Sequence, residues 1–73
     1  MKAFVLIETK MGKGREVVTA IGKLDGVTSV DAVNGPYDVV VVVKGNSLNE
    51  IGDLAARIHP VPGISRMVTC LAE

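Results

Sequence analysis

The sequence predicts an α+β domain of the ferredoxin-like type, with the element order βαββαβ and two helices on one face of a four-stranded antiparallel sheet. Three observations lead to this prediction. Five consecutive valines at 39–43 indicate a central strand that is apolar on both faces. A helix exit, a glycine, a β-branched residue and a hydroxyl residue follow one another at 24–30 and again at 61–67, so each half of the chain reads as strand, helix, strand. A tight-turn pattern at 34–37 joins the halves.

The first half contains a strand, a helix and a second strand. Residues 2–9 (KAFVLIET) are apolar and β-branched, which is typical of a strand. A helix is expected at about 15–24, because Val17, Val18, Ile21 and Leu24 recur at helical spacing. Gly26 suits the left-handed position that ends a helix. Residues 27–33 alternate as a strand does, with Val27, Ser29, Asp31 and Val33 predicted on one face and Thr28, Val30 and Ala32 on the other.

The second half repeats this order. Residues 38–44 are the predicted third strand, and Ser47 with Glu50 has the form of a capping box at the start of the next helix. Leu48, Ile51, Leu54, Ala55 and Ile58 form the apolar stripe of that helix. Pro60 ends the helix, and residues 64–71 are the fourth strand. Seventy-three residues suffice for one domain only, so we expect residues 1–73 to fold as a single unit.

The valine strand also predicts an oligomer. Val39, Val41 and Val43 must lie on one side of it, and Val40 and Val42 on the other. Two helices can cover only one face of the sheet, so another molecule must cover the second face. We therefore expect at least a homodimer, of the kind found in dimeric α+β barrels.

Composition argues against several classes of function. Eight basic and eight acidic residues cancel, no two Lys or Arg residues are adjacent, and Phe4 and Tyr37 are the only aromatic residues. We therefore expect no direct DNA binding. The apolar run from Ala3 to Ile7 is too short for a secretion signal or a membrane span. The expectation is a cytoplasmic protein with no membrane association.

No residue pattern indicates catalysis or metal binding. The single cysteine, Cys70, lies in an apolar strand and is expected to be a small buried hydrophobic residue. The single histidine, His59, is expected to cap a helix C-terminus, and no cysteine or carboxylate cluster accompanies it. The stretch Gly12 to Arg15 lacks the spacing of known phosphate-binding loops. The sequence therefore predicts no catalytic residue, no metal site and no cofactor.

The turn Gly35-Pro36-Tyr37-Asp38 has two interpretations. It can be a plain connection in which Asp38 bonds its own backbone. It can also be a binding loop held by a rigid scaffold.

Residues 24–71 resemble the effector-binding domain of the Lrp/AsnC family of transcriptional regulators. The features that match are Gly-Val at the start of the second strand, the Gly-Pro-Tyr-Asp turn, the valine strand, the capped helix, Pro62 to Arg66, and Thr69. In that family the domain is βαββαβ, pairs through its sheet faces, and assembles dimers into octamers or similar rings. An amino acid binds between dimers near the turn that corresponds to residues 35–38.

The resemblance implies roles for individual residues. Gly35 would let the backbone approach the ligand, and Asp38 would accept a hydrogen bond from its α-ammonium group. Tyr37 and Val39 would line the pocket, and Thr69 would offer a hydroxyl group. Met67 stands where the family often has Ser or Thr, which bears on ligand identity. The helix-turn-helix half of the family is absent from this sequence, so it resembles a stand-alone effector domain that co-assembles with a full-length regulator.

The leading interpretation is a small oligomeric module that binds a free amino acid and has no enzymatic activity. One alternative is a small dimeric α+β-barrel enzyme of the monooxygenase or isomerase type, although such enzymes usually place polar or histidine side chains where this strand has valine. Another is a purely structural oligomerisation module, or an ACT-like regulatory domain detached from an enzyme.

Overall fold

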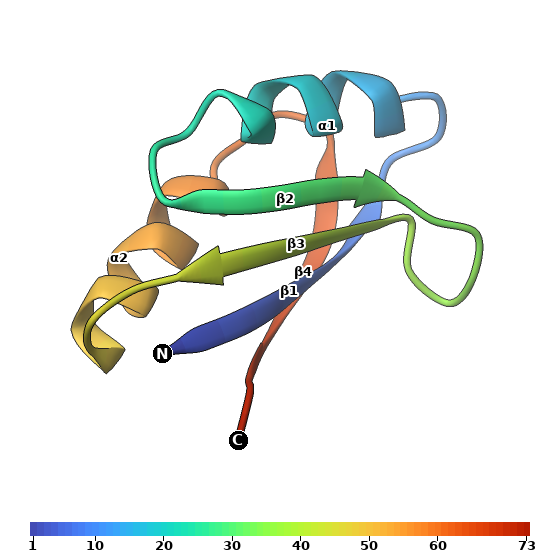
Figure 1. The fold of residues 1–73 in the computed structure, drawn as a ribbon. Coiled ribbons are helices and arrows are strands. Elements are labelled where there is room, and N and C mark those ends of the chain that lie inside the picture. Colours follow the sequence, from blue (N-terminus) through green and yellow to red (C-terminus); the bar gives the residue numbers. More distant parts are fainter.

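The computed structural model describes all 73 residues. Its elements are β1 (Lys2–Thr9), α1 (Gly14–Gly22), β2 (Val27–Ala32), β3 (Val39–Lys44), α2 (Leu48–Ile58) and β4 (Ile64–Leu71) (Figure 1). The four strands form one sheet in the order β2-β3-β1-β4, and every neighbouring pair is antiparallel. The predicted βαββαβ order and fold class are confirmed.

Local chemistry sets the helix ends. α1 ends two residues before the predicted Leu24, because the N–H groups of Lys23 and Leu24 bind the carbonyls of Ala20 and Ile21, a tighter turn than the α-helix makes. α2 begins as predicted, with the Oγ of Ser47 accepting the N–H of Glu50 at 3.2 Å.

Gly26 and Gly63 occupy equivalent places in the two halves. Each follows a helix and precedes a strand, with φ of 92° and 101° respectively. A side chain is disfavoured at such angles. Both sites are also crowded, since a Cβ at Gly63 would lie 2.9 Å from the Cβ of Lys13. The repeat seen in the sequence is therefore a repeat of backbone conformation.

The core lies between the sheet and the helices. Alternate residues of the two central strands are buried, and the apolar stripes of both helices pack on them. The eleven buried residues are Ala3, Val5, Ile7, Val17, Ile21, Val39, Val41, Val43, Ile51, Leu54 and Ile58. The predicted division of the valines between two faces is confirmed.

β2 departs from the predicted alternation. Val27 pairs with Val43, but Ser29 pairs with Val42, so the register shifts between Val27 and Ser29. Because of this bulge, Val27 packs against the core together with Val30, whereas the regular alternation placed them on opposite faces. The face predicted for Val27 was wrong, since an irregularity in the pairing reverses the side on which a residue lies.

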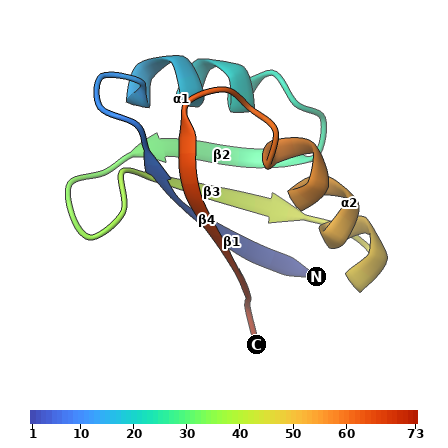
Figure 2. The ribbon, with the colours of Figure 1, turned by 180° about the vertical axis from the view of Figure 1, so that it is seen from behind.

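No helix covers the second face of the sheet, which we call the open face (Figures 1 and 2). By strand register its centre is apolar, made of Phe4, Leu6, Val40, Val42 and Val68, all half-buried. Cys70 pairs with Phe4 and is exposed. The expectation of a buried Cys70 was therefore wrong for the single chain, because this residue lies on the uncovered face of an edge strand.

The helix side is incompletely covered along β4. Thr69 pairs with the buried Val5, and Leu71 with the buried Ala3, yet both β4 residues are exposed.

The two chain ends lie at the same end of the sheet, and the β2–β3 connection lies at the other (Figure 1). No helix is long and apolar enough to cross a membrane.

Candidate functional site

The β2–β3 connection, residues 33–38, projects beyond the sheet at the end away from both termini (Figure 1). The N–H of Val33 binds the carbonyl of Asp38 at 2.9 Å, and the N–H of Asp38 binds the carbonyl of Ile7 at 2.8 Å. Asn34 to Tyr37, the four residues predicted as a turn, lie between Val33 and Asp38. The loop is closed at its base and exposed at its tip.

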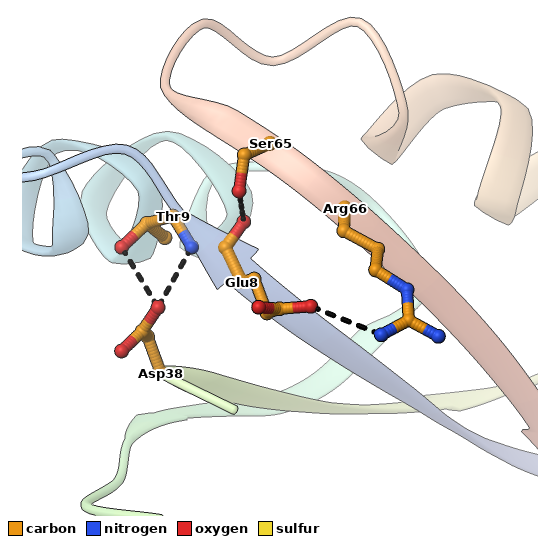
Figure 3. Close-up of polar contacts among 5 residues, drawn as sticks. All are labelled: Glu8, Thr9, Asp38, Ser65 and Arg66. Atoms are coloured by element: carbon orange, nitrogen blue, oxygen red, sulfur yellow. Dashed lines mark hydrogen bonds and ion pairs between the residues drawn. The ribbon is translucent and has the colours of Figure 1, made fainter. Parts of the chain in front are cut away.

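Asp38 holds this loop to the end of β1. Its Oδ2 accepts the backbone N–H of Thr9 at 2.8 Å and lies 3.4 Å from the hydroxyl of Thr9 (Figure 3). The carboxylate therefore bonds a residue 29 positions away, and not its own backbone as the plain-turn interpretation expected. No bond is formed by Oδ1, which leaves one oxygen of an exposed carboxylate available at the loop.

A second polar group lies beside this contact. Arg66 forms an ion pair with Glu8 at 3.2 Å, and the Oγ of Ser65 donates to the carbonyl of Glu8 at 3.0 Å (Figure 3). Glu8 and Thr9 end β1, while Ser65 and Arg66 begin β4, and antiparallel pairing brings them together. We call Glu8, Thr9, Asp38, Ser65 and Arg66 the polar cluster. It presents carboxylates, a guanidinium group and two hydroxyl groups at the end of the sheet that holds the loop.

Sequence reasoning did not assign Ser65 and Arg66 to the site, nor did it assign Glu8 and Thr9. A signal was present, since these two polar residues end the apolar run of residues 3–7. Their contact with Asp38 and Arg66 depends on the pairing of β1 with β3 and β4, which local patterns do not specify.

The six predicted ligand-binding residues lie in three places within one chain. Gly35, Tyr37 and Asp38 share the loop, where Gly35 and Asp38 are exposed and Tyr37 is half-buried. Val39 is fully buried in the core, and Met67 is half-buried on the same side, with Ile7 between them in the sheet. Thr69 lies further along β4, opposite Val5, on the exposed edge strand. One chain therefore brings together the loop residues but does not bring Thr69 to them.

Gly35 differs from the glycines that end the helices. Its φ is not in the left-handed region, and a Cβ built on it would meet no atom within 4 Å. Neither the backbone nor the packing of a single chain requires glycine here. A requirement for glycine, where one exists, must come from something outside the chain.

No enclosed cavity lies at this loop. The larger surface hollow, about 700 Å³ and widely open, is at the opposite end of the sheet and is lined by residues that include Lys2, Lys44 and Glu50. The second hollow lies beside α2 and is likewise lined by Lys44 and Glu50. Neither contains any of the six predicted residues. A ligand at the loop would therefore need a wall supplied by another chain.

The remaining candidate residues lie apart from the loop. His59 is the C-cap residue of α2, as predicted, and it is exposed. Cys70 lies near the far end of β4 from the polar cluster. No group of three or more His, Cys, Asp or Glu side chains is placed to hold a metal ion.

Comparison with known proteins gives a consistent result over the whole chain. A family model described as "Lrp/AsnC ligand binding domain" matches residues 2–72. The HTH-type transcriptional regulator FL11 of Pyrococcus horikoshii is 31% identical over 64 residues, which are 88% of this chain and 42% of that protein. The chain thus spans less than half the length of that curated relative.

Solved structures agree with this match. TTHA0845 from Thermus thermophilus has a TM-score of 0.92 and 34% identity, and the similarity covers 99% of this chain and 91% of that one. The transcriptional regulator NMB0573 of Neisseria meningitidis, solved as a complex with L-Met, has a TM-score of 0.84 and 17% identity, covering 99% of this chain and 49% of that one. At that identity the second similarity shows the shared fold.

Proposed function

Since the chain belongs to the Lrp/AsnC ligand-binding domain family, we propose that it is a small oligomeric module that binds a free amino acid and modulates a full-length regulator of the same family by co-assembly. Its curated relatives are transcriptional regulators, and the family resemblance drawn from residues 24–71 is confirmed. The oligomer, the ligand and the co-assembly are the steps that go beyond family membership.

The open face supports the oligomer. It presents the apolar side chains of five residues from three strands, and no segment of the chain covers it. Fully burying an exposed side chain of this kind contributes about 1.5–3 kcal/mol, and covering these half-buried side chains gains part of that. A domain of this size has a small core, so covering this face with a second copy adds stability that a single chain lacks.

The empty space around Gly35 is the observation that most favours a ligand at the loop. A glycine without a backbone or packing requirement in the chain is explained when the backbone must approach another molecule closely. The L-Met complex of the Neisseria regulator shows that a protein with this fold takes an amino acid. In this chain, Asp38 offers a carboxylate oxygen to an α-ammonium group.

The positions of the other predicted residues favour a site shared between chains. Thr69 lies opposite Val5, away from the loop of its own chain, so a site made by two copies accounts for the predicted roles of both. Val39 is buried beneath the loop and would support it without touching the ligand. Met67 is half-buried beside Ile7 and would limit how far an apolar side chain of the ligand could extend into the protein.

A thermal-shift screen against the twenty amino acids, followed by calorimetry with the best one, tests the ligand. Gly35→Ala should not lower the melting temperature of the ligand-free protein but should weaken binding, because its methyl group meets nothing in the chain. Gly52→Ala is the matched control, since it adds a methyl group in equally open space on α2 and should leave binding unchanged. Equal affinities of Gly35→Ala and wild type would remove Gly35 from the site.

Co-assembly has its own test. A tagged copy of the chain, expressed with a full-length Lrp/AsnC-type regulator from the same organism, should co-purify with it at a fixed ratio. Recovery of the tagged chain alone at matched expression would contradict this part of the proposal.

A structural module is the second candidate, and the bond between Asp38 and Thr9 favours it. One oxygen of that carboxylate is already used to fasten the loop, which is a sufficient reason for its presence. If no amino acid binds more tightly than millimolar, the chain acts through assembly alone.

A further inference from the structure

Charged residues surround the apolar centre of the open face in an uneven pattern. At the β1 start, the ammonium group of Lys2 lies 5.1 Å from the centre of the Phe4 ring, which places its charge over this face. Lys44 pairs with Lys2 in the sheet, so two basic residues are neighbours at this end. On the outer strand β2, Asp31 pairs with Val40 and therefore lies on the same face.

These charges lack partners within the chain. The two ion pairs of the structure join Lys13 to Glu16 and Glu8 to Arg66. Lys2 and Asp31 are in neither of them, and β3 separates their strands. Glu50 and Glu73 line the same surface hollow as Lys2 and Lys44, but no ion pair joins either carboxylate to these lysines. Lys2 and Asp31 thus remain available to a molecule that covers the face.

We propose that Lys2 forms an ion pair with Asp31 of the partner subunit when two copies pack open face to open face. This inference rests on the dimer of the proposed function and specifies how the two copies are oriented. In a two-fold interface the same contact occurs twice, so the two ion pairs would lie on either side of the apolar centre.

Electrostatic complementarity selects this orientation over its main competitor. If the two copies aligned like end on like end, Lys2 would face Lys44 of the partner subunit and not a carboxylate. Juxtaposed like charges at an interface disfavour the wrong arrangement strongly, whereas complementary charges set the register of association. Glu8 is a weaker candidate for Lys2 because it is already paired with Arg66.

The pair would also determine which chains this module accepts. Its apolar centre fits any similar apolar face, so selectivity must come from the polar rim. A related chain would be accepted when it presents a carboxylate opposite Lys2 and an ammonium or guanidinium group opposite Asp31. This is a rule for partner choice based on two surface positions.

A charge exchange tests the inference. The variants are Lys2→Glu, Asp31→Lys and the double variant that contains both, with Lys23→Glu and Asp53→Lys as controls of equal charge change at exposed helix-side positions. Each single variant places like charges together twice in its homodimer. Each homodimer should therefore dissociate about ten- to a hundredfold more readily than wild type. The double variant should dimerise as wild type does.

Mixing the two single variants gives the sharpest readout. In the mixed dimer both pairs are again of opposite charge, so native mass spectrometry should show mainly heterodimer, and about 1 M salt should reduce that preference. Recovery of dimers on mixing also shows that both variants fold.

A statistical mixture of homodimers and heterodimers, with a dimeric wild type, would overturn the orientation and leave the proposed function standing. A wild type that stays monomeric would overturn both. Equal loss of dimer in the Lys23→Glu and Asp53→Lys controls would show that net charge, and not this pair, is responsible.

Discussion

Replacing Asp38 separates its two proposed tasks, which are fastening the loop and binding the ligand. Asp38→Ala removes the acceptor of the Thr9 N–H at 2.8 Å and of the longer contact with the Thr9 hydroxyl at 3.4 Å. A hydrogen bond to a charged group contributes about 1.5–3 kcal/mol. Because Asp38 is exposed, water competes for the same donors, and we expect a loss of about 1–1.5 kcal/mol.

That loss is measurable in a chain of this size. One kcal/mol lowers the melting temperature of a domain of 60–100 residues by about 4–8 °C. Asp38→Ala should therefore lower it by about 4–12 °C. The comparison must be made at one protein concentration, since assembly changes apparent stability.

Asp38→Asn distinguishes the charge from the bond. The amide oxygen can still accept the Thr9 N–H, but as a neutral acceptor it contributes only about 0.5–1.5 kcal/mol. The melting temperature of Asp38→Asn should fall by less than half as much as that of Asp38→Ala. Affinity for an amino acid should nonetheless fall about tenfold or more, because the ammonium group loses its charged partner.

Thr9→Val provides the control for the hydroxyl group. It removes the 3.4 Å contact, which is at the long limit of a hydrogen bond, and keeps the N–H that forms the shorter one. We expect almost no change in melting temperature. If Asp38→Ala has the same melting temperature as wild type, Asp38 does not fasten the loop. If Asp38→Asn binds the amino acid in calorimetry with unchanged affinity, the charge of Asp38 does not bind the ligand.

Three further predictions concern the backbone, the open face and DNA. Gly63→Ala should destabilise the protein by about 1–3 kcal/mol in chemical denaturation, because it combines a φ of 101° with a Cβ 2.9 Å from that of Lys13. Gly52→Ala, on open helix surface, should instead stabilise by about 0.4–1 kcal/mol, and equal effects of the two would contradict this account. Replacing Val40 and Val42 with aspartate should abolish the dimer and give unfolded or aggregated protein. The oligomer itself would be refuted if analytical ultracentrifugation showed the wild type to be a well-folded monomer at micromolar concentration. The chain should show no sequence-specific DNA binding, given its zero net charge; a gel shift at nanomolar protein that survives moderate salt would show otherwise.

Local patterns in the sequence determined the elements and their order. The alternation of Val39 to Val43 assigns each valine to a face whatever the rest of the chain does, since a strand has a period of two. Ser47 and Gly26 likewise act on their immediate neighbours, as a helix cap and as a left-handed residue. These features depend on a few adjacent residues, and they could be predicted.

The tertiary structure alone decided which distant residues meet and which faces are covered. Thr9 became the partner of Asp38 because β1 pairs with β3 in one particular register. Val27 lies on the helix side of the sheet, and not on the predicted face, because of a bulge in the pairing of β2 with β3. Cys70 is exposed because β4 is an edge strand and nothing covers the open face. Register and coverage are set by packing over the whole chain, where many weak contacts are satisfied together, so no short stretch of sequence specifies them.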